Sequence, residues 1–349
     1  MIAIAAPATH AQLPPLQSPP GWGRVPQGTG ACSVEKTCAD LAPGMIRNAL
    51  GPSPLDRETR DLAEILSSHD SSVSRDAARW AFDAFHRAGA DQVRAEAFGS
   101  PGGPDSVVAE IRGRDHPDDY VLIAAPLVET GTNPVAAAEN AAVLVDAVRV
   151  IHASGSIPRR SIRFVLFATG AHNTTGRSAS VWAYIRLHGA DLDRIAAAAA
   201  IDATSGPLDG YSLEDRPETL SAVREALSPL QTLGIRKFTQ AVLVPTVVTP
   251  FWLEGIPTLV ATSSTPAESH RRVVSSPDNV ALAEIDQLKR AVAIAAVTSY
   301  ALADAEARIG PRRSRLEVEH SIHSGALEPK LKASGLWAQW HATRSDALR

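Results

Sequence analysis

The hydrophobic positions along residues 56–307 follow two spacings, one helical and one typical of strands. Apolar residues recur at helical spacing in segments 56–68 and 74–88, which predicts a helix in each. Segments 92–98 and 106–112 alternate apolar and polar residues around a turn rich in Gly and Pro, which predicts an antiparallel pair of strands. The continuous apolar run at 120–125 is typical of a central strand that is buried on both faces.

The same alternation continues through the second half of the chain. We expect helices at 134–155, 178–188, 217–230 and 279–307, and strands at 162–167, 194–201, 238–244 and 256–261. Strands separated by helices imply a mostly parallel sheet. The predicted fold class is therefore α/β, a three-layer sandwich in which helices cover both faces of a mixed, mostly parallel central sheet.

The flanking segments differ in composition and divide the chain into three predicted parts. Residues 1–55 combine a signal-like start with an extended arm rich in Pro and Gly, residues 56–310 form the α/β domain, and residues 311–349 form a charged C-terminal appendage. Trp337 and Trp340 lie three positions apart in this appendage. Two alternatives stay open there: a short helix that packs back on the domain, or a solvated tail.

Charge and hydropathy exclude two classes of partner. The formal net charge is −4 and no basic patch stands out, so we expect no nucleic-acid binding. No apolar run approaches the roughly 20 residues of a membrane span. Residues 1–11 are apolar and end in small residues, like the tail of a secretory signal, but lack a positively charged start. We expect a secreted or periplasmic protein, with a cytoplasmic one as the alternative.

The cysteines of the chain, Cys32 and Cys38, are six positions apart. This separation fits neither a CxxC redox motif nor a zinc knuckle. In an exported protein a small local disulfide would be expected, whereas in the cytoplasm they would be two ordinary thiols.

Residues 163–176 are the stretch around which we interpret the chain. An apolar strand pattern breaks at a turn of small residues, and a helical pattern begins after Gly176. Enzymes of the α/β class place their chemistry at such strand ends. This turn holds no carboxylate, no cysteine and no serine in a nucleophile-elbow pattern. The scaffold is typical of an enzyme, but the expected chemical groups are missing.

The order of five patterns across residues 57–308 resembles the co-catalytic two-zinc exopeptidases, the aminopeptidase and plasma glutamate carboxypeptidase (carboxypeptidase Q)-like family. The patterns are Val107–Gly113, His116–Ile123, Ala138–Ala142, Arg160–Phe167 and Gly255–Pro257. The resemblance implies a single α/β domain of the zinc-exopeptidase type. It also implies peptide hydrolysis by two zinc ions that share a bridging carboxylate and a water, with a glutamate as general base.

Most positions that carry this chemistry in the family hold residues without metal-binding atoms here. Zinc is bound by Cys, His, Asp or Glu, and of the ligand positions only Asp202 retains such a residue. We therefore expect no catalytic residue, no bound metal and no cofactor. The family positions fall, in chain order, on Pro126, Val128, Ala138, Gly170 (the general base), Ala171, Asp202 and Val274.

Five polar residues remain around the expected cleft and allow two interpretations. They could form a new ligand site or a single weak metal site. The interpretation that we favour treats them as capping and loop residues, because Asp202 follows a strand and Glu139 lies early in a helix. The five residues are Glu129, Glu139, His172, Asp202 and His270.

Two hypotheses of function follow from this comparison. The first is a catalytically inactive homologue of the zinc exopeptidases, a pseudopeptidase that acts as a binding or structural module for a peptide or another protein. The alternative is a metal-dependent aminopeptidase or carboxypeptidase that uses zinc through displaced ligands.

Overall fold

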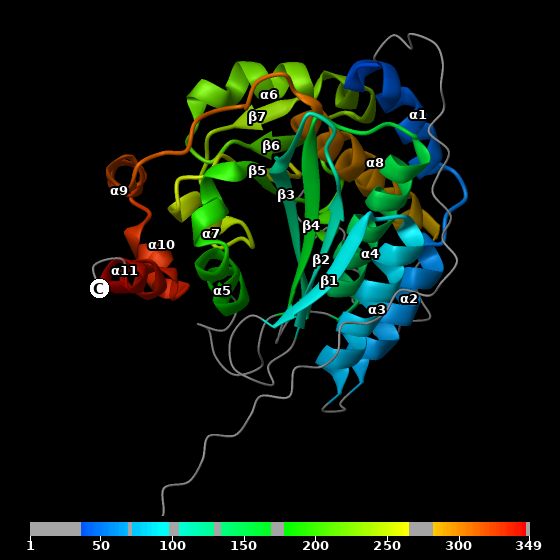
Figure 1. Ribbon diagram of the computed structural model, residues 1–349, viewed down its shortest axis with the longest axis horizontal. Helices are drawn as coiled ribbons and strands as arrows, with labels where there is room; N and C mark the ends of the chain where they lie inside the picture. The colour runs from blue at the N-terminus through cyan, green and yellow to red at the C-terminus, as the bar shows by residue number, and fades with distance from the viewer. Residues whose placement is uncertain are drawn as a thin grey trace, which may run out of the picture. The chain divides into compact units, whose positions relative to one another are not determined.

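The computed structural model describes residues 36–68, 72–97, 105–128, 134–168, 178–264 and 282–346. Within these residues an eight-stranded mixed sheet has helices on both faces (Figure 1), so the predicted α/β class is confirmed. The strand order across the sheet is β1-β2-β4-β3-β5-β8-β6-β7. The strands are β1 (Gln92–Ala97), β2 (Asp105–Ile111), β3 (His116–Val128), β4 (Arg160–Ala168), β5 (Ile195–Ala200), β6 (Gly210–Ser212), β7 (Lys237–Thr239) and β8 (Thr258–Thr262).

Four parallel strands, β4, β3, β5 and β8, form the middle of the sheet. The predicted hairpin of β1 and β2 adds to β4 in antiparallel orientation, and β6 pairs antiparallel with β8 on the other side. Val121 of β3 lies opposite Ile162 of β4 and Ala197 of β5. β3 therefore has neighbours on both sides, which explains why its sequence is apolar without alternation.

The first face of the sheet carries the larger core. Val121, Ile123 and Ala125 of β3 point to this face because side chains alternate along a strand. α4 is buried around most of its circumference, as its apolar sequence requires. The helices with buried residues in this core are α1 (Cys38–Leu50), α2 (Leu55–Ser67), α3 (Val73–Ala88), α4 (Pro134–Ala153), α6 (Leu220–Ala226) and α8 (Leu282–Asp304).

The second face is covered in part by the C-terminal residues. Tyr120, Leu122 and Ala124 of β3 pack here. Trp340 is 1% exposed, and its indole Nε1 donates a hydrogen bond of 3.1 Å to the carbonyl oxygen of Leu253. Of the two alternatives for the appendage, the described residues therefore pack back on the domain. The helices on this face are α5 (Ala179–Leu187), α7 (Thr249–Leu253), α9 (Arg315–Ser324), α10 (Glu328–Ala333) and α11 (Leu336–Asp346).

The prediction of an extended arm through residue 55 is wrong for residues 38–50, which form α1. Thr37 and Asp40 form a capping box at its start, and Pro43 inside the helix is exposed. Leu41, Met45 and Ala49 recur at helical spacing and are buried against the core. This burial outweighs the local tendency of Pro and Gly to interrupt a helix.

Two segments of the second half also differ from the prediction. The expected helix at 217–230 is broken, because α6 ends at Ala226 and a 3-10 turn that contains Pro229 follows it. The expected strand at 238–244 stops at Thr239. The backbone N–H of Leu243 bonds to the side chain of Glu214, not to a neighbouring strand.

Several other predictions concern surface and terminal features. The signal-like residues 1–11 and Cys32 lie outside the described residues. Cys38 is the first residue of α1, where burial and the nearby Asp304 carboxylate raise the pKa of its thiol to about 12.

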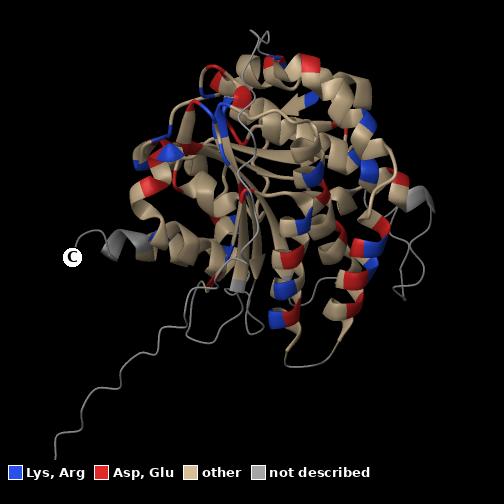
Figure 2. Cartoon of the chain, turned by 45° about the vertical axis from the view of Figure 1, so that its right-hand side comes forward, with Lys and Arg blue, Asp and Glu red and all other residues tan. Residues whose placement is uncertain are grey.

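Across the part of the chain that the structure describes, no helix combines the length and apolarity needed to cross a membrane. Figure 2 shows acidic and basic residues interspersed on the helices of the side in view.

The packing of α11 predicts a large difference between its two tryptophans. Trp340→Ala should lower the free energy of unfolding by about 3–5 kcal/mol, because it removes a fully buried aromatic side chain. The matched control is Trp337→Ala, which truncates a half-buried indole on the same helix. Urea titrations of both variants measure the effect, and equal losses would show that Trp340 is not a core residue.

Candidate functional site

The parallel pairing brings the carboxyl ends of the central strands to one edge of the sheet. Val128, the last residue of β3, lies opposite Ala168 at the end of β4, and Ala124 lies opposite Ala200 at the end of β5. β8 is parallel to β5 and ends at Thr262. Ligand sites of open α/β sheets lie at this edge. We call it the carboxyl edge, and it is the location that the sequence predicted for a site.

Only part of the predicted residue set belongs to the described structure. Pro126, Val128, Ala138, Glu139 and Asp202 are described, and all lie at or next to the carboxyl edge. The remaining predicted positions lie outside the described residues, and their arrangement stays a prediction. They are Glu129, Gly170, Ala171, His172, His270 and Val274.

The two family positions on β3 carry only hydrocarbon. Pro126 lies opposite Phe167 and Val128 opposite Ala168, with an irregularity of the strand register between them. Proline cannot donate a backbone hydrogen bond, which is consistent with its place at the irregular end of the strand. Neither side chain offers an oxygen, nitrogen or sulfur atom to a metal ion.

Ala138 on α4 is fully buried, and the polar function in this turn belongs to its neighbour Asn140. The Asn140 side chain spans from α4 to the end of β5. Its Nδ2 donates to Asp202 Oδ1 at 3.2 Å, and its Oδ1 accepts the backbone N–H of Ala203 at 2.8 Å. Asn140 is 8% exposed. The sequence did carry a signal for this bridging role, because Asn140 is a polar residue within the apolar pattern of α4. The sequence-based prediction did not identify it.

Asp202 caps the 3-10 turn Ala203–Ser205. Its Oδ1 accepts the backbone N–H of Thr204 at 3.0 Å and the Thr204 hydroxyl at 2.6 Å, in addition to Asn140. The turn is also held by α8, because Gln287 Nε2 donates to the Ala203 carbonyl at 3.2 Å. These bonds are the ones expected of a capping aspartate. They agree with the interpretation of Asp202 as a capping residue.

The described donor set does not fit a two-zinc centre. Two zinc ions with a shared carboxylate need several Asp, Glu or His side chains that converge. Pro126, Val128 and Ala138 supply none, and within the described residues no three His, Cys, Asp or Glu side chains gather closely enough for a metal ion. We therefore derive no metal-dependent step from this edge.

Comparison with known proteins identifies the fold. No protein-family model and no curated protein matches the sequence. Solved structures do match. A peptidase M28 precursor from Shewanella amazonensis has a TM-score of 0.67 at 14% identity, over 79% of this chain and 99% of that one. LapB from Legionella pneumophila has a TM-score of 0.57 at 18% identity, over 75% and 74%.

A glutaminyl cyclase from Macrostomum lignano is also similar, with a TM-score of 0.56 at 14% identity over 78% of this chain and 95% of the cyclase. The chain therefore has the zinc-exopeptidase-like fold of the M28 peptidases, as the sequence resemblance implied. At these identities the likeness defines the fold alone, so the site has to be judged from the residues of this chain.

A second polar feature lies at the opposite edge of the sheet, where the central parallel strands begin. Glu214 follows β6, which runs antiparallel to β8. Its side chain is 2% exposed, and the backbone N–H of Leu243 donates to its Oε2 at 3.0 Å. Burial raises the pKa of Glu214 from 4.5 to about 7, and hydrogen bonds to Leu243 and Ser212 offset only part of this rise.

The backbone around Glu214 is strained as well. Glu214 and Asp215 have φ angles of 51° and 58°, in the left-handed region that side chains with a Cβ rarely adopt. The carbonyl oxygen of Glu214 accepts the indole N–H of Trp252 at 2.9 Å. The segment after β6, the segment around Leu243 and α7 are thus joined at one residue.

If Asp202 is a cap and not a metal ligand, its carboxylate charge is dispensable. Asp202→Ala should lower the free energy of unfolding by about 0.5–2 kcal/mol, the cost of a lost cap. Asp202→Asn keeps an oxygen that can accept from Thr204, so it should retain most of the stability. Urea titrations in chelator-treated buffer compare the two variants. A larger loss for Asn than for Ala would contradict the capping role.

Glu214 predicts a pH dependence of stability. The pKa of Glu214 is higher in the folded state than in the unfolded state. The stability that the protonated side chain contributes is therefore fully present below about pH 4.5 and is lost as pH rises through about 7. The variant Glu214→Gln cannot ionise at this position. The free energy of unfolding of the variant minus that of the wild type should therefore increase by about 3 kcal/mol between pH 4.5 and pH 8. The exposed Glu64→Gln is the control. Urea titrations across this range that show a constant difference for Glu214→Gln would refute the assignment.

Proposed function

We propose that this chain is a catalytically inactive homologue of the zinc exopeptidases, and that it acts as a binding or structural module for a peptide or protein. The observation that carries the proposal is chemical. Three described family positions at the carboxyl edge, Pro126, Val128 and Ala138, hold no metal-binding atoms, although the fold is similar to that of an M28 peptidase precursor.

The hydrogen bonds of Asp202 support the same proposal. Asp202 is the family ligand position that retains a carboxylate, and here it closes a turn with Thr204 and Asn140. Removing a side chain that only caps a turn affects stability, whereas removing a catalytic ligand affects activity. The two roles can therefore be separated by experiment.

The alternative is a metal-dependent exopeptidase with displaced ligands. One observation favours it: β3, β4 and β8 all end at the carboxyl edge, and the segments that follow them contain Glu129, His172 and His270. One of the similar structures is LapA of Legionella pneumophila, described as an aminopeptidase. On this alternative zinc would be the cofactor, and Asp202 would be one of its ligands.

The proposal predicts that zinc neither activates nor stabilises the protein. Aminoacyl anilides and dipeptides should not be hydrolysed above the buffer rate, with or without added zinc. A tight ligand at a hundredfold excess over its Kd would contribute about 2.7 kcal/mol to stability, so the thermal midpoint should stay unchanged if no zinc site exists.

Asp202→Asn provides the control for this experiment. If the wild type hydrolyses an anilide, if a chelator abolishes that hydrolysis, and if folded Asp202→Asn lacks it, the alternative holds and the proposal is wrong. Activity that persists unchanged in Asp202→Asn and in the presence of chelator would be assigned to a contaminating peptidase.

A further inference from the structure

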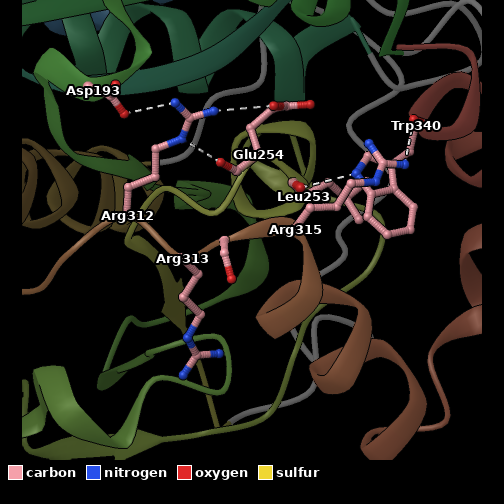
Figure 3. Close-up of a pocket in the computed structure, with 8 residues that line it drawn as sticks. Asp193, Leu253, Glu254, Arg312, Arg313, Arg315 and Trp340 are labelled. Carbon is pink, nitrogen blue, oxygen red and sulfur yellow. Dashed lines mark hydrogen bonds and ion pairs between the residues drawn. The ribbon is translucent and has the colours of Figure 1, made fainter. Parts of the chain in front are cut away.

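A cavity of about 390 Å³ lies where α7, the turn before β5 and the C-terminal helices meet (Figure 3). Asp193 precedes β5 and Glu254 precedes β8, so this cavity lies at the edge where the parallel strands begin. Asp202 follows β5 and lies at the other edge. The volume is in the range of small-molecule sites. The lining residues are Asp193, Leu253, Glu254, Arg312, Arg313, Ser314, Arg315 and Trp340.

Arg315 is held in a fixed orientation on one side of this cavity. Its guanidinium carbon lies 4.2 Å from the centroid of the Trp340 ring, and its Nη2 donates to the Trp340 carbonyl at 3.2 Å. Trp340 is itself fixed by its bond to Leu253. A guanidinium that is already ordered loses little freedom when it binds a ligand.

Arg312 holds a second guanidinium on the other side (Figure 3). Its Nη1 donates to Asp193 Oδ1 at 2.8 Å, and its Nε donates to the Glu254 carbonyl at 2.8 Å. Arg313 turns away from the cavity and bonds to Glu218 and Ser321. Two guanidinium groups therefore face this cavity, with the hydrocarbon of Leu253 between them.

Two of the carboxylates beside these guanidinium groups, Asp193 and Glu319, are weakly held. The Asp193 side chain is 81% exposed, and Arg315 lies 3.5 Å from Glu319 in a pair that is one-third exposed on both sides. Such exposed pairs contribute little to stability, so a ligand can replace them. The Glu254 side chain, which is 19% exposed, lies 3.4 Å from Arg312 Nη2 and stays beside it when a ligand binds. At the start of α9 the backbone N–H groups of Ser314 and Glu317 are already bonded within a capping box.

A carboxylate fits this arrangement better than a cation does. Its two oxygens match the planar donors of a guanidinium, and an attached apolar group would contact Leu253 and the edge of Trp340. We propose that this cavity binds a small molecule that carries a carboxylate next to an apolar group, with the carboxylate on Arg315 and Arg312. The proposal does not depend on the function of the carboxyl edge, because the two sites share no residue.

Calorimetric titration of the full-length protein with N-acetyl-leucine tests this site. We expect saturable binding with a Kd of about 1 mM or tighter, and binding at least about tenfold weaker for N-acetyl-leucine amide, which lacks the charge. Arg315→Met, which keeps the packing on Trp340, should weaken binding by about tenfold or more. Inorganic phosphate at equal ionic strength distinguishes an apolar carboxylate site from a general oxyanion site.

Two further variants make the test independent of a folding defect. Glu319→Gln removes the carboxylate that competes for Arg315 and should tighten binding by about twofold to fivefold. Arg224→Met, which removes an arginine above the ring of Phe238, is the matched control and should bind as the wild type does. Absence of saturable binding up to about 10 mM, equal binding of the amide, or binding of phosphate without N-acetyl-leucine would overturn the proposal.

Discussion

The parallel pairing of β3 with β4 and β5 is the constraint on which the structure depends. β3 is hydrogen-bonded on both sides and buried on both faces, so its register sets the position of the strands around it. The same pairing places Val128, Ala168 and Ala200 at one edge. Whatever the chain binds at the carboxyl edge must use the residues that follow these strands.

The sequence predicted this framework well because the information is local. A run such as Tyr120–Ala125 is typical of a strand with neighbours on both sides, and the strand-helix alternation then implies the layers. The prediction failed for α1, where Pro and Gly indicated an arm and burial of Leu41 and Met45 made a helix. It also failed after β7, because the partner of the Leu243 N–H is a side chain 29 positions away.

In the candidate site too, some features follow from the sequence and others depend on the fold. That Pro126, Val128 and Ala138 cannot bind zinc follows from their chemistry and needs no coordinates. The role of Asp202 did not follow from its chemistry, since a carboxylate after a strand suits a metal ligand and a helix or turn cap equally well. Its bond to Thr204 is local, but its bond to Asn140 requires α4 to approach the end of β5, and Asn140 and Asp202 are 62 positions apart in sequence. The hydrophobic pattern of the sequence does not predict which residues so far apart in the chain come into contact.

The two edges of the sheet thus differ in their chemistry. The described family positions at the carboxyl edge are apolar except Asp202, which belongs to a hydrogen-bonded capping network, whereas the opposite edge holds the buried Glu214 and a cavity faced by Arg312 and Arg315. This contrast supports a binding module on a peptidase-like fold. Metal analysis of protein purified without chelators tests the central claim most directly. The account predicts zinc far below one equivalent per chain, and a value near two equivalents would contradict it.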